Sequence, residues 1–124
     1  MRILAFTAPI LAFAMGCDQV NELDDCSGEG VDATLAITDV GFDPDNLTID
    51  EEDVVRFVNN TDEVVAVEGF NDDDNDLFED PEFDFEIRPD QEFCAEFNRG
   101  SESYTLRNAI NPSARTGSIV VLNN

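Results

Sequence analysis

The chain has 124 residues, which is enough for one domain with a single core. Its formal net charge is −23, from 29 acidic and 6 basic residues, so its surface repels phosphates and we expect no nucleic acid partner. Hydrophobic residues make up 42%, with 10 phenylalanines, so a folded core is expected despite the charge. The chain has no histidine, which excludes any site built on imidazole.

Residues 1–16 are predicted to be a targeting segment. A short positive start is followed by an apolar run, Ile3 to Met15, which is too short to cross a bilayer comfortably and contains Pro9. This is the pattern of a secretory signal. The ending "AMGC" resembles a bacterial lipoprotein box, and that resemblance implies that Cys17 is acylated and becomes the new N-terminus. Ordinary signal cleavage after "AFA" is the alternative.

The three cysteines are Cys17, Cys26 and Cys94. An exported protein rarely leaves a thiol unpaired, so acylation of Cys17 would leave Cys26 and Cys94 to form a disulfide. The expected product is an exported lipoprotein, periplasmic or on the outer face of the cell envelope, whose lipid anchor makes the membrane a partner. Residues 17–30 are polar, acidic and without periodicity, which predicts a tether. The domain is expected to cover 31–124.

From residue 31 onward the patterns predict short strands and no amphipathic helix. Alternation of apolar and polar residues, with turn residues between, marks eight candidate segments: 31–40, 41–50, 53–60, 63–70, 83–90, 92–98, 103–108 and 117–123. Seven or eight such strands are typical of a β-sandwich or barrel. In "EFCAEFN" we expect Phe93, Ala95 and Phe97 to point inward, and Cys94 and Glu96 outward.

Three stretches in order resemble the cupredoxin family. They are "ITDVGFDPDNLTIDEEDVVRFVNNTDEVVAV", "RPDQEFCAEFN" and "SYTLRNAINPSARTGSIVV". The resemblance covers about residues 31–122 and implies an all-β, Greek-key β-sandwich. It also implies four copper-ligand positions, which this chain occupies with Val65, Asn108, Asn111 and Ala114. Blue copper needs a thiolate and two imidazoles, and these side chains supply neither. A metal-free domain without a cofactor is therefore expected.

The loop Asn108–Arg115 has two interpretations. Asn and Pro form turns, and an Asn amide can bond to the backbone that a metal would otherwise organise, so the loop can simply close the sandwich. Alternatively, with Arg107 and Arg115, it is a recognition patch for an unknown protein partner. We expect the chain itself to be a monomer.

A second candidate site is an acidic loop with the spacing of a calcium site. Four aspartates match positions 1, 3, 5 and 9 of such a loop: Asp72, Asp74, Asp76 and Asp80. Leu77 replaces the glycine that the sharp turn requires, and Phe83 replaces the bidentate glutamate. The alternative is a solvated acidic loop between strands.

No catalytic group stands out, because the sequence has no histidine base and no glycine-rich phosphate loop. We therefore expect that this protein is not an enzyme. The sequence favours a lipid-anchored, metal-free cupredoxin-like module of the cell envelope with a binding or structural role. One alternative is a protein that binds calcium or other cations through its carboxylates. Another is a member of a copper-binding electron-transfer family that has lost its metal site.

Overall fold

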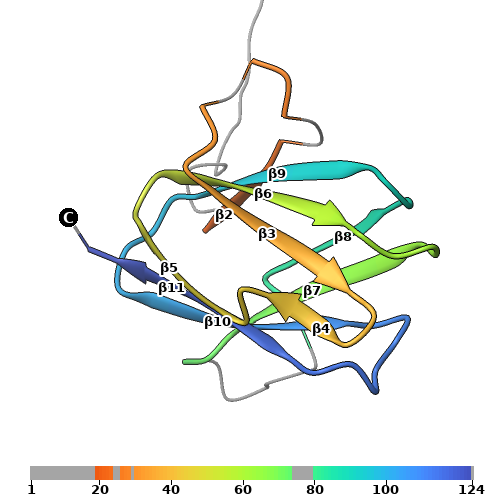
Figure 1. Ribbon diagram of the computed structural model, residues 1–124. Helices are drawn as coiled ribbons and strands as arrows, with labels where there is room; N and C mark the ends of the chain where they lie inside the picture. Colours follow the sequence, from red (N-terminus) through yellow and green to blue (C-terminus); the bar gives the residue numbers. More distant parts are fainter. Residues whose placement is uncertain (1–18, 24–25, 29, 74–79, 124) are drawn as a thin grey trace, which may run out of the picture.

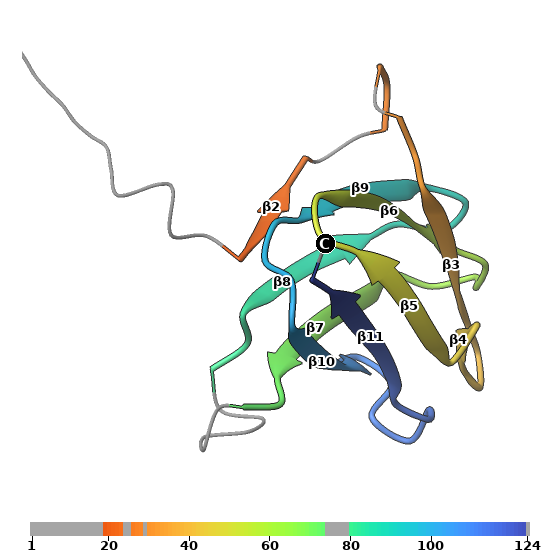
Figure 2. The ribbon, with the colours of Figure 1, turned by 90° about the vertical axis from the view of Figure 1, so that its left-hand side faces the viewer.

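The computed structural model describes residues 19–23, 26–28, 30–73 and 80–123. These form an all-β sandwich of two five-stranded sheets (Figure 1 and Figure 2), which confirms the expected class. One sheet has the order β5-β11-β10-β7-β8, with bounds Asn46–Asp50, Gly117–Leu122, Glu102–Asn108, Val65–Asn71 and Phe83–Ile87. The other has the order β2-β9-β6-β3-β4, with bounds Val20–Glu22, Glu92–Phe97, Asp53–Asn59, Ala33–Thr38 and Gly41–Asp43.

The described residues thus contain ten strands instead of the seven or eight expected. One extra strand arises because the segment 41–50 is split at Pro44, which has no N–H group to continue a ladder. Its first part, β4, pairs with β3, while its second part, β5, pairs with β11 in the opposite sheet. The other extra strand is β2, which lies in the segment expected to be a tether and pairs with β9.

The core lies between the sheets and combines aliphatic side chains with a cluster of aromatic rings. Phe93, Ala95 and Phe97 are buried in it, as the alternation in β9 predicted. Phe85 of β8 stacks on Phe93 with ring centroids 3.9 Å apart, and Phe83 meets Phe97 edge to face at 5.6 Å. Because β8 and β9 belong to different sheets, these ring pairs hold the two layers together.

The sandwich has two ends, which strand β10 connects. The loop end comprises the turn 39–40, the connection 60–64 and the loop 109–116, which gather on the right of Figure 1. The N-terminal end comprises Gln19, Asn71 and Glu102, which are joined by hydrogen bonds. At about 3.3 Å per residue, β10 separates Glu102 from Asn108 by about 20 Å.

Candidate functional site

A cavity of about 300 Å³ opens at the loop end. Six polar residues line it: Thr38, Asp39, Thr61, Glu63, Asn108 and Asn111. Val64, Val65 and Ile110 supply its apolar lining. The lining comes from both sheets and includes two carboxylates but no basic side chain, so the cavity combines negative charge with apolar walls.

Asn108, at the end of β10, organises the inner side of this cavity. It is only 5% exposed, and its Oδ1 atom accepts hydrogen bonds from the N–H groups of Ala66 and Ile110, both at 3.2 Å. The backbone N–H of Ala109 also donates to the carbonyl of Ala66 at 2.8 Å. One amide side chain therefore ties the start of β7 to the start of the loop, as the turn-forming interpretation of the loop anticipated.

The rest of the loop closes the end of the sandwich through further hydrogen bonds. Asn111 donates through Nδ2 to the carbonyl of Asp39 at 3.3 Å and accepts through Oδ1 from the Ser113 hydroxyl at 2.9 Å. The N–H of Arg115 donates to the carbonyl of Val40 at 2.9 Å. These contacts fix the loop against the β3–β4 turn.

The two arginines of the suggested recognition patch are placed differently. Arg107 projects toward β7, where its Nη2 lies 2.7 Å from Oε1 of Glu68 and its guanidinium lies over the Phe70 ring. Arg115 is exposed in the loop. Arg107 is therefore engaged within its own sheet, and Arg115 alone extends from the loop as a basic group.

Three of the four positions implied by the resemblance lie around one cavity. Val65, the first residue of β7, is 2% exposed and lines it together with Asn108 and Asn111. Ala114 is half-buried and donates its N–H to the carbonyl of Asn111 at 3.0 Å, but it does not line the cavity. Among the residues described, no three Cys, Asp or Glu side chains come close enough to hold a metal ion.

Asn59 holds two lining residues of the cavity, Thr61 and Glu63, in place, and this role did not emerge from the sequence. It is fully buried at the end of β6 and donates through Nδ2 to the carbonyls of Glu63 and Ile87, both at 2.8 Å. Its Oδ1 accepts from the N–H and hydroxyl of Thr61 at 2.8 and 2.7 Å. The signal for it was an Asn at the end of a strand with Thr two residues later, an Asx-turn pattern.

A second polar cluster lies at the N-terminal end, where sequence reasoning expected none. The hydroxyl of buried Tyr104 donates to Oε1 of Gln19 at 2.7 Å, and Nδ2 of Asn71 donates to the same atom at 2.9 Å. Burial, followed by the nearby charges of Glu102 and Glu82, raises the pKa of Tyr104. The hydroxyl therefore stays protonated at neutral pH and acts as a donor, which fixes Gln19 to the body.

The structure describes only part of the acidic loop, including Asp72 and Asp80 of the four candidate calcium ligands. Asp72 uses both carboxylate oxygens to accept from hydroxyls of β10, from Ser103 at 2.6 Å and from Thr105 at 2.6 Å. Asp80 is exposed. Asp74 and Asp76 lie outside the described residues. Asp72 is thus committed to holding the end of β7 against β10.

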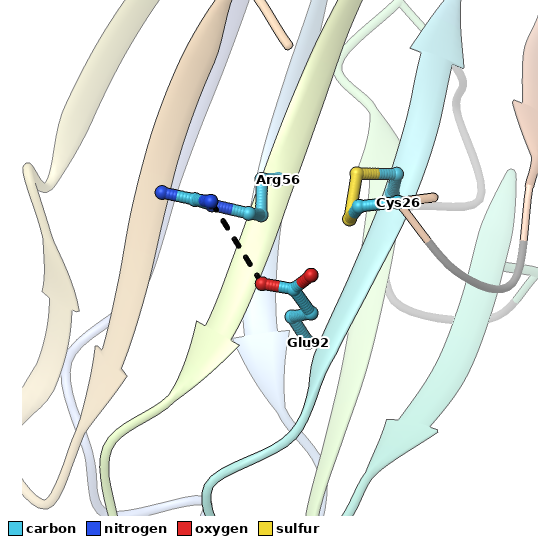
Figure 3. Close-up of a disulfide and its surroundings, with 4 residues drawn as sticks. Cys26, Arg56 and Glu92 are labelled. Carbon is cyan, nitrogen blue, oxygen red and sulfur yellow. Dashed lines mark ion pairs between the residues drawn. A yellow bond between two sulfur atoms is a disulfide. The ribbon is translucent and has the colours of Figure 1, made fainter. Parts of the chain in front are cut away.

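The expected disulfide between Cys26 and Cys94 is present, with Cα atoms 5.2 Å apart (Figure 3). Cys94 points away from the core, as predicted, yet it is 0% exposed. The segment that carries Cys26 covers this outer face, and Leu23 donates its N–H to the carbonyl of Cys94 at 2.9 Å. Beside the disulfide, Arg56 and Glu92 form a long, partly exposed ion pair at 3.9 Å, which contributes little stability.

The part of the chain that the structure describes has no helix with the length and apolar character needed to cross a membrane.

No sequence model of a protein family matches the chain, and no curated protein matches it by sequence. Solved structures of amicyanin are similar in three dimensions. Amicyanin from Paracoccus versutus (Thiobacillus versutus) is 19% identical with a TM-score of 0.63, over 84% of this chain and 98% of that one. An oxidised mutant of amicyanin is 17% identical with a TM-score of 0.62, and a Cu(I) mutant is 15% identical with a TM-score of 0.61, each over 84% of this chain and 99% of the other. Identities this low define architecture alone, and the chain therefore has a cupredoxin-like fold.

Proposed function

We propose that this protein is a metal-free, lipid-anchored module of the cell envelope that binds a partner at its loop end. The observation that carries the proposal is the bonding of Asn108. Its Oδ1 joins the start of β7 to the loop by two ordinary hydrogen bonds, so protein groups help to hold the cavity in shape. A rigid sandwich that presents a preformed cavity between loops is a common arrangement for binding.

The donor set around the cavity does not suit copper. It consists of hydroxyls, amides, carboxylates and apolar groups, whereas a blue-copper site needs a thiolate and imidazoles. Both cysteines that the structure describes are joined in the disulfide, so neither supplies a thiolate. The amicyanin structures include Cu(I) forms, and only their architecture is shared with this chain.

The disulfide and the fold are consistent with an extracytoplasmic protein, because disulfides persist in oxidising compartments.

The N-terminal contacts favour a short connection to the membrane. Gln19 accepts from the N–H of Asn98 at 2.8 Å, and β2 follows at once. Cys17 precedes Gln19 by two residues, so even a fully extended chain places it at most about 7 Å from Gln19. An acyl group there would hold the N-terminal end near the bilayer, with the loop end about 20 Å farther out.

Replacing Cys17 with Ser should move the protein from the membrane fraction to the soluble fraction, or leave the precursor unprocessed. Acylation requires the thiol, and Ser cannot replace it. Asn21→Ser, at an exposed position of β2, is the matched control and should stay with the membrane. Cell fractionation and mass analysis of the mature N-terminus provide the readout. A soluble wild-type chain that begins at Met15 would contradict the anchor and support ordinary signal cleavage.

Copper binding separates the proposal from a functioning copper protein. The wild-type chain should show no intense thiolate-to-copper absorption when copper(II) is added, because it has no thiolate–imidazole set. Combining Val65→His, Asn108→Cys, Asn111→His and Ala114→Met should create a coloured centre if these positions converge as the resemblance implies. The same variant with Asn108 retained is the control and should stay pale.

Two results would count against these expectations. Tight, one-to-one copper binding by the wild-type chain would contradict a metal-free function. If the variant with all four substitutions folds but stays pale, the assigned ligand positions would be contradicted. Ala114 would then be the position to re-examine first, because it does not line the cavity. In that case a metal-free binding function would still stand.

A further inference from the structure

The side-chain amide of Asn108 has a hydrogen-bond donor that the described fold does not use. The N–H groups of Ala66 and Ile110 fix the amide's orientation, because a flipped amide would place its NH₂ group against two other donors. Among the described residues, Nδ2 of Asn108 has no acceptor. It is also not one of the fully buried side-chain atoms without a partner, since among the described residues only Nε of Arg56 is of that kind. Nδ2 is therefore accessible to another molecule, and Asn108 lines the cavity from which it can be reached.

Two carboxylates line the same cavity nearer to solvent. Asp39 and Glu63 are exposed, whereas Asn108 is 5% exposed, so the donor lies deep and the charges lie at the opening. Within the described residues neither carboxylate has an ion-pair partner. The chain's net charge of −23 strengthens the negative potential around them. The cavity thus favours a ligand with an acceptor at its inner end and a positive charge at its outer end.

Apolar surface beside the carboxylates adds a third requirement. Val64 is 37% exposed and Ile110 is 49% exposed, and both line the cavity. The alkyl stem of a lysine or arginine can lie on such surface while its charged head stays in water. The volume of about 300 Å³ is at the lower limit for ligand pockets, which suits one residue of a polypeptide better than a large cofactor.

We infer that the cavity binds a basic segment of a partner polypeptide. One backbone carbonyl of the partner accepts from Nδ2 of Asn108, and an adjacent lysine or arginine pairs with Asp39 or Glu63 over Val64 and Ile110. This inference deepens the proposed binding function and rests on it. An anion would be opposed by the two carboxylates, and a bare metal ion would meet the NH₂ group of Asn108 instead of a lone pair.

The test uses ¹⁵N-labelled mature chain carrying Cys17→Ser, kept in EDTA, and two small probes. Nα-acetyl-lysine N-methylamide offers carbonyls and an ammonium group, while the norleucine analogue has the same carbonyls and a similar stem without charge. The lysine probe should shift the side-chain NH₂ resonances of Asn108 saturably, with a dissociation constant in the roughly millimolar range. The norleucine probe should bind several-fold more weakly at the same resonances.

Variants separate the two contacts. Asp39→Asn and Glu63→Gln should each weaken the lysine probe by about two- to five-fold, as for an exposed charge pair. Asp62→Asn, at an exposed neighbouring position that does not line the cavity, should leave its affinity unchanged. Asn108→Asp keeps the acceptor for Ala66 and Ile110 but loses the donor, so the norleucine probe should no longer bind. If Asn108→Asp does not fold, the inference is still tested by the shifts of the Asn108 NH₂ resonances in the wild type and by the affinities of the Asp39, Glu63 and Asp62 variants for the lysine probe.

Three outcomes would overturn the inference. The Asn108 NH₂ resonances could stay unmoved at saturating lysine probe, the two probes could bind equally well, or Asp62→Asn could weaken binding as much as Glu63→Gln. The last result would indicate general attraction to an acidic surface. Because EDTA excludes copper, each of these failures leaves the metal-free function intact, whereas failure of that function would appear in the copper titration.

Discussion

Replacing Cys26 and Cys94 together with serine is expected to lower the free energy of unfolding by about 4 kcal/mol. The disulfide closes a loop with a sequence separation of 68, and the chain-entropy model gives about this value for a loop of that length. The native state also loses the link that holds the segment around Cys26 over the outer face of β9. Denaturant unfolding of the oxidised wild type and the double variant, under identical salt conditions, measures the difference.

The control for this experiment is the wild-type chain with its disulfide reduced and both thiols kept free by a reductant. It should lose a similar amount of stability, because the cross-link is absent in both forms. A loss below about 1 kcal/mol in the double variant would show that the bridge adds little to a fold already held by its core.

Asn59→Ala is expected to destabilise the fold by about 3 kcal/mol, the cost of leaving buried polar groups unpaired. The substitution removes the donor to the carbonyls of Glu63 and Ile87 and the acceptor for Thr61. Because Thr61 and Glu63 also line the cavity, the variant should weaken ligand binding as well. Thermal or denaturant unfolding gives the stability, and the lysine probe gives the binding.

Asn60→Ala is the matched control, since this neighbouring side chain is exposed and should tolerate the change within about 0.5 kcal/mol. Asn59→Asp provides a second test. It keeps the acceptor for Thr61 but turns a carboxylate oxygen toward two carbonyls, so it should be at least as damaging as Asn59→Ala. Equal stability of the Asn59 and Asn60 variants would contradict a supporting role for Asn59.

Much of the architecture follows from local patterns that the sequence displays openly. The alternation in β9 correctly placed Phe93, Ala95 and Phe97 in the core, because a period of two leaves little freedom once one face is apolar. The disulfide between Cys26 and Cys94 was predicted without knowledge of the fold, from cysteine parity and the expectation that Cys17 is acylated.

Two features of the fold were beyond such patterns. β2 has only three residues, with one buried side chain, Val20, so it carries no measurable periodicity. The position of β2 depends on the disulfide, on the edge of β9 and on Gln19. None of these belongs to the three residues of the strand, so the pattern within the strand cannot reveal them. The change of sheet at Pro44 was also missed, because a proline within one apolar pattern marks a break without saying where the chain goes next.

The candidate site could be predicted only in outline. The resemblance brought Val65, Asn108 and Asn111 to attention, and the structure places them around one cavity. The free donor of Asn108 and the buried bonding of Asn59 depend on which backbone groups lie within about 3 Å, and no sequence pattern specifies that distance. The sequence did not single out Asp39 and Glu63 from the 29 acidic residues, because only the fold shows which acids line a cavity.

The central claim is that the loop end is a binding cavity held together by Asn108 in place of a metal. Its most direct test is elemental analysis of the mature chain purified from its own membranes, without chelators at any step. The account predicts far less than one equivalent of copper, or of any other transition metal, per chain, together with a fully folded protein. One equivalent of tightly held metal per chain, whose removal by EDTA lowers the thermal unfolding midpoint, would contradict it.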